Sequence, residues 1–262
     1  MKPAKIMSGL SALPIAAAGG LGLMWLLRGQ ADPRAKAFID KVGLLLLIVW
    51  VLVKVPDYPG QAKGQRLPIR QVFCMPGIRP ILAVVFTWML AHNMLYTFIA
   101  PFLASAGLGQ RVDGVLLLFG LAAIASIWLT GLLVDRWLRA LTVLSLALFA
   151  VSALVLGLAG QSAVAVLIGV AAWGLSFGGA PTLLQTALAD AAGEGADVAQ
   201  SMLVTVFNLA VASGGVAGGL LLGWLGARAL PWALAVLALA CLSVVWPARQ
   251  AGFRPGRRSM AA

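Results

Sequence analysis

Apolar residues along this chain fall into eight long runs that short polar segments separate. Because a helix needs about 20 predominantly apolar residues to cross the hydrocarbon core of a bilayer, these runs predict membrane-spanning helices. The predicted fold is therefore all-α, a polytopic membrane helix bundle with about eight transmembrane helices. The runs are Ile6–Leu27, Ala37–Val53, Ile81–Leu108, Gly114–Val134, Leu141–Gly160, Ser162–Ala189, Val198–Leu225 and Ala229–Trp246.

The first two runs are less regular than the last six. Asp40 and Lys41 leave only about a dozen uninterrupted apolar residues in the second run, which is short for a span. The first run begins like a secretory signal, with Lys2 and Lys5 before an apolar core and three alanines after it. The apolar residues continue as far as Leu27, however, which favours a retained helix over a cleaved signal.

Basic residues in the connections predict the orientation of the helices. The segment 54–79 carries five Lys and Arg residues against the single acid Asp57, so the positive-inside rule places it in the cytoplasm. Alternation then puts Arg136 and Arg139 inside, the turn at Gln161 outside, and the basic tail 249–262 inside. The same alternation puts the basic connection 28–41 outside, against the rule. Residues 1–53 therefore either do not form two spans or do not continue naturally into the rest of the chain.

Composition excludes other classes of protein. At 61% hydrophobic and 10% charged residues, with a mean hydropathy of +0.99, the chain is too apolar for a soluble domain, which carries about 25% charged residues. The net charge is +11, and the Lys and Arg residues that carry it lie almost wholly between the apolar runs. No basic-aromatic surface accompanies them, so the charge indicates membrane orientation rather than nucleic-acid binding. Cys74 and Cys241 are isolated and suggest neither a disulfide nor a metal site.

The stretch from Trp173 to Gly226 combines a polar face with a glycine row. Ser201, Thr205 and Asn208 share one helical face, and polar groups at bilayer depth should face protein or water rather than lipid. A glycine at every fourth position lets a neighbouring backbone come close, so this row predicts a helix-packing face. Its members are Gly215, Gly219 and Gly223.

Two further segments carry polar groups at mid-membrane depth. Trp88, His92 and Tyr96 recur at a spacing of four, with Asn93 beside His92, the only histidine. His92 is either a neutral imidazole satisfied by a neighbouring helix or a group that contacts a ligand or relays protons.

In the sixth run, Pro181 after Gly178 and Gly179 should loosen the helix and free carbonyls that need partners. The alternative is a helix that is kinked but closely packed. The polar side chains available there are Trp173, Ser176, Gln185 and Thr186.

No catalytic motif is visible in the sequence. GxSxG, HExxH and glycine-rich phosphate loops are missing, so we predict neither an enzyme nor a cofactor. Asp190, Glu194 and Asp197 occupy one short loop without His or Cys, which makes a poor metal site and favours a solvated acidic turn.

Three stretches resemble the major facilitator superfamily, close to its sugar-efflux and drug:proton antiporter branch. One is 95–103, another is the loop with Gly131, Asp135, Arg136 and Arg139, and the third is 173–187 followed by 197–201 and Asn208. The loop departs from the family pattern at Leu138, where glycine is usual, and at Ala140, where a basic residue is.

The resemblance implies a specific domain arrangement. Such permeases have twelve helices in two halves and bind the solute between the halves near mid-membrane. Residues 80–248 would then be the carboxy-terminal half, and residues 1–53 would be the remnant of a first half, before the loop 54–79. The implied location is the cell inner membrane, with a cytoplasmic carboxy terminus.

The resemblance also implies proton-coupled export of a sugar-like or drug-like solute. The bilayer, the solute and protons would be its partners. The rival interpretation is a shortened, non-transporting membrane protein, or a half-permease that needs a second chain for its missing helices. The implied solute-contacting residues are Trp88, His92, Asn93, Tyr96, Gln185, Thr205 and Asn208, and the implied cytoplasmic loop motif is Gly131, Asp135, Arg136 and Arg139.

Overall fold

The computed structural model describes residues 67–254, together with residues 42, 45 and 48–50. The predictions for the first apolar run, for most of the second, for residues 54–66 and for the end of the tail lie outside these residues. The chain divides into two compact units, Met1–Gln61 and Ala62–Ala262. In the first unit, the described residues 42, 45 and 48–50 are helical.

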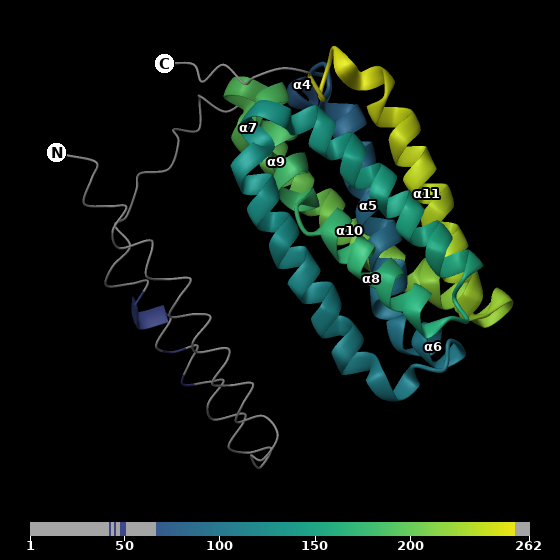
Figure 1. Ribbon diagram of the computed structural model, residues 1–262. Helices are drawn as coiled ribbons and strands as arrows, with labels where there is room; N and C mark the ends of the chain where they lie inside the picture. Colours follow the sequence, from purple (N-terminus) through teal and green to yellow (C-terminus); the bar gives the residue numbers. More distant parts are fainter. Residues whose placement is uncertain (1–41, 43–44, 46–47, 51–66, 255–262) are drawn as a thin grey trace. The chain divides into compact units, whose positions relative to one another are not determined.

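The described part of the second unit is built of helices joined by short turns (Figure 1). No strand occurs among the described residues, which agrees with the predicted all-α fold. The helices are α4 (Ile69–Phe73), α5 (Ile78–Thr97), α6 (Ile99–Ser105), α7 (Val112–Leu158), α8 (Ala163–Phe177), α9 (Ala180–Ala192), α10 (Ala196–Leu225) and α11 (Leu230–Val245).

Helix α7 is two spans joined at a sharp turn. Its 47 residues would measure about 70 Å if straight, roughly twice the thickness of a bilayer core. At Trp137 the backbone leaves the helical region, with φ −131° and ψ 25°. The chain reverses direction at that point (Figure 1), so the two arms of α7 correspond to the fourth and fifth predicted runs.

Four helical stretches in the described residues are long and apolar enough to cross a membrane. Two of them contain 50 and 63 residues, enough for two crossings each. Helices α8 and α9 together make one such crossing and α10 the next. The stretches are Ile78–Thr97, Gly109–Leu158, Ala163–Leu225 and Ala227–Val245.

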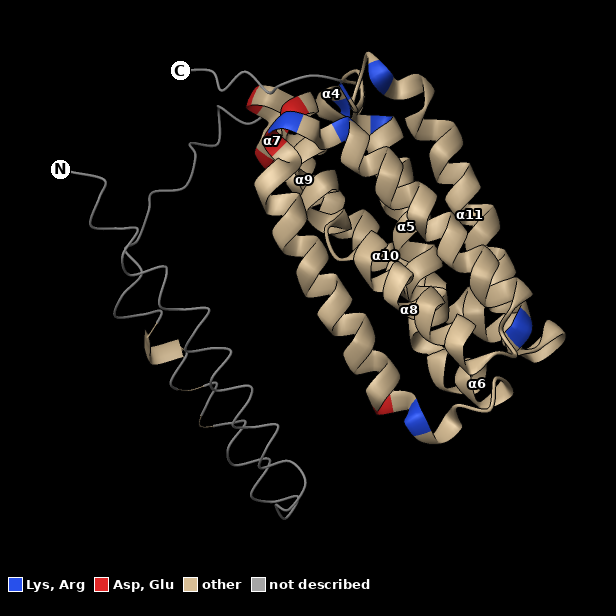
Figure 2. Ribbon diagram, in the orientation of Figure 1, with Lys and Arg blue, Asp and Glu red and all other residues tan. Residues whose placement is uncertain are grey.

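The polar and apolar surfaces of this unit suit a bilayer. Large apolar side chains cover its outside, including Trp224, which is 81% exposed, whereas the charged residues of the described part gather at its two ends (Figure 2). We call the end formed by α4, the Trp137 turn and the end of α11 the α4 end. Six of the eight described arginines lie there, and Arg111 and Arg228 lie at the other end.

Helix α10 packs along α5 through glycines, of which only Gly219 belongs to the predicted row. A Cβ added at Gly214 would lie 2.8 Å from the Asn93 Cβ, and one at Gly218 would lie 2.8 Å from the Phe98 ring. Within the described residues, a Cβ at Gly219 would lie 3.4 Å from the Phe98 ring, and one at Gly215 or Gly223 would meet nothing within 4 Å. Gly215 and Gly223 of the predicted row therefore take no part in this contact, because spacing alone does not fix the rotation of a helix.

This difference predicts opposite outcomes for two neighbouring substitutions. Gly214→Ala should lower the thermal stability of the purified protein in detergent, since overpacking costs about 1–3 kcal/mol. Gly215→Ala adds the same methyl group in open space and should keep or raise stability, because alanine favours a helix over glycine by about 1 kcal/mol. Equal effects of the two changes would contradict this packing.

Candidate functional site

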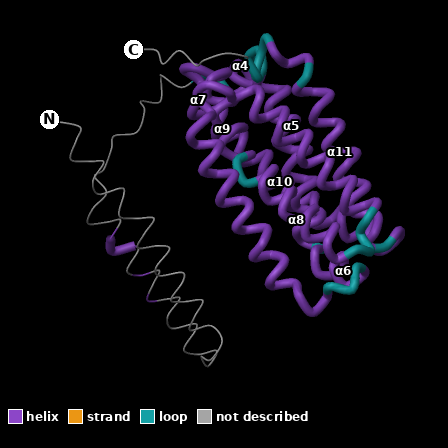
Figure 3. Tube along the Cα trace, viewed as in Figure 1, coloured by secondary structure: helices purple, strands orange, loops and turns teal. Residues whose placement is uncertain are grey.

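The helix that crosses the membrane as α8 and α9 is interrupted at Gly178 and Gly179 (Figure 3). Pro181 stands in the first turn of α9, where its missing N–H leaves no hydrogen bond unmade. The helix is thus interrupted just before Pro181, but Gly178 and Gly179 keep helical dihedral angles and leave no room for a Cβ, which agrees with the alternative of a kinked, closely packed helix. The sequence did not reveal what satisfies the polar backbone at this break.

The partner at the break comes from the first arm of α7. The Gly179 N–H donates a hydrogen bond to the buried Ser126 Oγ at 3.0 Å. At Gly178 an added Cβ would collide with the Ala123 carbonyl, and at Gly179 it would collide with Thr130. The two elements therefore approach as closely as glycine permits, and Ser126 satisfies a backbone donor that would otherwise be buried without a partner.

Directly beside the break lies a cluster of five rings, which we call the aromatic cluster. His92 stacks face to face on Phe177, with centroids 3.5 Å apart and planes inclined by 1°. The ring centroid of Trp173 lies 5.2 Å from that of His92, and the ring centroid of Phe119 lies 4.5 Å from that of Trp173. The Tyr96 ring stacks on His92 with a centroid distance of 5.3 Å, and Tyr96 is 46% exposed. Helices α5, α7 and α8 each contribute to the cluster.

The aromatic cluster contains polar atoms without partners. His92 is 8% exposed and Trp173 is 1% exposed, yet neither His92 Nδ1 nor Trp173 Nε1 has a hydrogen-bond partner in the described structure. Buried ring nitrogens are normally paired, and both of these are covered by protein atoms, so each keeps an unused capacity to bond to a water molecule or a ligand group that enters the cluster.

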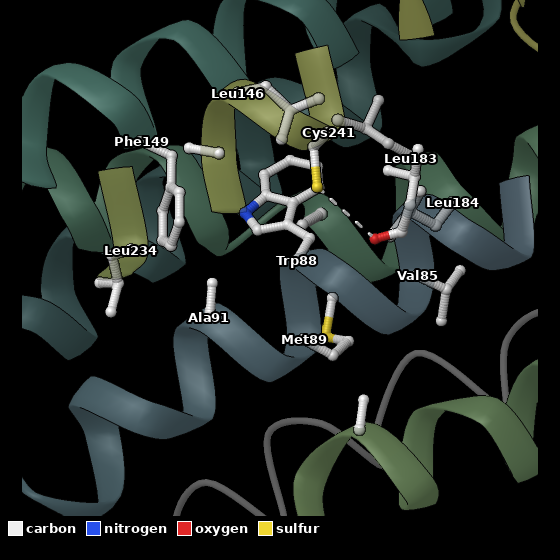
Figure 4. Close-up of a cluster of buried hydrophobic side chains, with 14 of the residues drawn as sticks. Val85, Trp88, Met89, Ala91, Leu146, Phe149, Leu183, Leu184, Leu234 and Cys241 are labelled. Atoms are coloured by element: carbon white, nitrogen blue, oxygen red, sulfur yellow. Dashed lines mark hydrogen bonds between the residues drawn. The ribbon is translucent and has the colours of Figure 1, made fainter. Parts of the chain in front are cut away.

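Trp88, predicted to contact a solute, lies in the apolar core, where its Nε1 also lacks a hydrogen-bond partner among the described residues. Its indole lies among Leu146 and Phe149 of α7 and Cys241 of α11 (Figure 4), and it is fully buried. Trp88 meets the rings of Phe149 and Phe177 edge-on at 6.2 and 6.3 Å, which links the core to the aromatic cluster. We do not include Trp88 among the solute contacts below.

Three of the remaining predicted contacts, Asn93, Thr205 and Asn208, have polar side chains that bond to their own helices. Asn93 Nδ2 donates to the Met89 carbonyl at 2.8 Å, Thr205 Oγ1 to the Ser201 carbonyl at 2.9 Å, and Asn208 Nδ2 to the Val204 carbonyl at 2.9 Å. Thr205, Asn208 and Gln185 are exposed. Each amide keeps its oxygen as a further acceptor, so these side chains remain able to bind another group.

The predicted loop motif lies at the α4 end. Arg139 Nη1 donates to the carbonyls of Val245 at 3.0 Å and Phe253 at 3.2 Å, and its Nη2 donates to the Trp246 carbonyl at 2.9 Å. Arg139 thereby caps the end of α11, whose last carbonyls have no donor within the helix. Partial burial and the charge of Arg249 lower the pKa of the Arg139 guanidinium, which lies in the turn between two spans.

The other members of that motif are placed differently. Asp135 and Arg136 are exposed just before the Trp137 turn, and a Cβ at Gly131 would meet no described atom within 4 Å. The glycines that pack closely against this arm of α7 therefore include Gly178 and Gly179 at the α8–α9 junction but not Gly131.

Comparison with known proteins places these helices in a family. The sequence model described as Major Facilitator Superfamily matches residues 6–198, which is most of the chain. The chain belongs to the major facilitator superfamily. This superfamily comprises transporters rather than enzymes, so the predictions of family and of a non-enzyme are confirmed, and the chain is a multi-pass membrane protein.

Individual members of the superfamily are similar over much of the chain. The purine ribonucleoside efflux pump NepI of Escherichia coli strain K12 is 31% identical over 187 residues, which is 70% of this chain and 46% of that relative. The protein of the same name from Shigella flexneri matches equally, and that from Shigella sonnei is 30% identical over 186 residues. The chain thus spans about half the length of these curated relatives.

The sequence did not single out three residues that take part in the aromatic cluster and the break beside it. Phe119 and Ser126 lie in an arm of α7 that reads as a uniform apolar run, and Phe177 reads as one more apolar residue before the glycines. Ser126 and Thr130 are the two hydroxyl residues of the fourth run, and this polarity was the only available signal for Ser126. Their roles depend on which helix lies opposite, and the spacing of residues within one run does not show that.

The hydrogen bond at the break predicts a measurable loss of stability. Ser126→Ala should lower the free energy of unfolding by about 1–2 kcal/mol, because the buried Gly179 N–H loses its acceptor. Ser201→Ala is a matched control, since the exposed Ser201 Oγ only donates to the Val198 carbonyl in its own helix. Both proteins would be unfolded by denaturant in mixed micelles, and indistinguishable curves would show that Ser126 does not support the break.

Proposed function

We propose that this chain is a transporter of the major facilitator type that exports a small organic solute in exchange for protons. The observation that carries the proposal is the aromatic cluster, in which His92 Nδ1 and Trp173 Nε1 lack partners at the break between α8 and α9. Stacking rings together with open hydrogen-bonding positions form the usual lining of a small-molecule site. The exposed Tyr96 marks its accessible edge.

A flat, heteroaromatic solute suits this lining best. Rings that already stack at 3.5–5.3 Å can exchange one neighbour for a heterocycle of similar size, and the two ring nitrogens can bond to its polar edge. The similar proteins from Escherichia coli and Shigella are named as purine ribonucleoside efflux pumps. We therefore take a purine ribonucleoside as the first solute to test, with sugar-like and drug-like compounds as further members of the panel.

Gln185, Thr205 and Asn208 would supply polar contacts outside the aromatic cluster. All three are exposed in this unit and present side chains with spare acceptors or donors. Proton coupling is proposed from the family resemblance, because no Asp or Glu lies within the six apolar runs from Ile81 to Trp246.

A flux measurement tests this proposal. The full chain would be reconstituted into vesicles that contain a radiolabelled purine ribonucleoside, and efflux would be followed after the external pH is lowered. We expect the nucleoside to leave these vesicles faster than it leaves vesicles without protein, and we expect the pH gradient to increase the rate of efflux further. Asn208→Leu should slow the initial rate about tenfold, since it removes a polar contact with the solute.

The control for this variant is Ser243→Leu on α11. Ser243 is also exposed and also donates only to its own helix, at the Ala240 carbonyl, so the two changes remove similar bonds. Both proteins should insert normally. Equal rates for the wild type and Asn208→Leu would remove Asn208 from the solute path.

A second candidate function is that of a half-permease that acts with another chain. The exposure of Thr205 and Asn208 favours it, because polar groups at this depth need a protein or water neighbour. Correctly inserted protein that gives no flux above empty vesicles would contradict autonomous transport. Flux that appears only when a second membrane protein is co-reconstituted would support the half-permease.

We propose that the protein lies in the inner membrane of the cell, with the α4 end and the carboxy terminus in the cytoplasm. This orientation predicts a labelling pattern. In a Cys74→Ala background, Gln161→Cys should react with a membrane-impermeant maleimide added to intact cells, because the turn at Gln161 would face outward. Cys241 is buried and should not interfere. Protection at 161 in intact cells with labelling after lysis would reverse the orientation, and Gln30→Cys would report separately on the first two apolar runs.

A further inference from the structure

A basic pocket lies at the α4 end, beside the Trp137 turn of α7. It has a volume of about 810 Å³. Its wall comes from the two arms of α7 and from the segment after α11, so it depends on contacts between parts of the chain about a hundred residues apart. The lining residues are Arg136, Trp137, Arg139, Ala140, Val143, Trp246, Pro247, Arg249 and Gln250.

The charge of this pocket is uncompensated by its own lining. Three of the nine lining residues are arginines and none is acidic. Arg139 uses three donor directions on backbone carbonyls, which fixes its guanidinium in place and leaves its charge without a counter-ion in the lining. Like charges held close together favour the entry of an anion, and guanidinium groups bind phosphate with two parallel hydrogen bonds.

Two tryptophans flank these arginines where the spans end. Trp137 is 59% exposed and Trp246 is 70% exposed. Tryptophan is enriched at the level of lipid headgroups, where its ring meets acyl chains and its N–H meets polar groups. Leu144 of α7 and Leu239 of α11 are also exposed on the same two helices, so apolar surface continues from the arginines toward the centre of the bilayer.

We propose that this pocket binds the phosphate headgroup of an anionic phospholipid. Arg136 and Arg249 would bind the phosphate, Arg139 would add a fixed positive charge behind it, and Trp137 and Trp246 would hold the glycerol region and the first acyl carbons. Basic pockets between transmembrane helices are known binding places for acidic lipid headgroups. The pocket does not take part in the proposed solute path and does not depend on it.

Binding can be measured directly on the full chain. The detergent-purified protein would be titrated with phosphatidylglycerol or phosphatidylcholine, and bound lipid would be counted by native mass spectrometry. We expect phosphatidylglycerol to bind at least tenfold more tightly. The double variant Arg136→Gln with Arg249→Gln should weaken phosphatidylglycerol binding about thirtyfold, as expected for the loss of two interfacial arginines, and should leave phosphatidylcholine unchanged.

The matched control removes the same number of charges at the other end. Arg111→Gln with Arg228→Gln has the same net charge as the first double variant and leaves the pocket intact, so it should bind phosphatidylglycerol like the wild type. Equal weakening by both double variants would overturn the proposal, because net charge alone would then explain binding. A wild type that does not distinguish the two lipids would overturn it as well.

A competition experiment identifies the source of the phosphate. Inorganic phosphate and glycerol 3-phosphate at millimolar concentration should displace little phosphatidylglycerol, because they lack the acyl chains that Trp137 and Trp246 contact. Complete displacement by either anion would show a site for a soluble phosphate compound and would contradict a lipid site.

Keeping Arg139 in both double variants preserves the cap of α11. Equal melting temperatures of the wild type and the two double variants would confirm this.

Discussion

The close approach of the α8–α9 junction to the first arm of α7 is the contact on which this unit depends. Gly178 and Gly179 leave no room for a side chain, and Ser126 supplies the acceptor that the broken helix needs there. A membrane interior offers no water to replace such an acceptor. The position of Phe177 and Trp173 against Phe119 follows from this contact, and so does the aromatic cluster around His92.

Polar groups in this unit are satisfied in different ways. Several hydroxyl and amide side chains, such as Thr205 and Asn208, bond to a carbonyl of their own helix, which satisfies the donor but does not tie helices together. Ser152 of α7 instead donates to the Gly169 carbonyl of α8 and joins two helices. The ring nitrogens of His92 and Trp173 have no hydrogen-bond partner among the described residues, and neither does Trp88 Nε1 in the neighbouring core. Unpaired ring nitrogens therefore lie both in the aromatic cluster and beside it, since the Trp88 ring meets Phe177 edge-on.

The sequence predicted the spans well because bilayer thickness imposes a length that a single run already displays. It also predicted an irregularity at Pro181, since the missing N–H and the two preceding glycines act locally, but it did not decide between a loosened helix and a closely packed kink. It did not predict which glycines of α10 face α5, since Gly214 and Gly215 differ only in rotation about the helix. For the same reason, Trp88 and His92 share a face by spacing, yet one lies in the apolar core and the other in the aromatic cluster.

Arg139 has a consequence for the order in which the protein is made. Its acceptors lie 106 residues later at Val245 and 114 residues later at Phe253. At about 5–20 residues per second, the ribosome delivers them roughly 5–20 s after Arg139 itself. During that interval the guanidinium must stay at the membrane surface among water and headgroups. The two arms of α7 can insert and turn early, whereas this corner of the protein closes only when the last span has been synthesised.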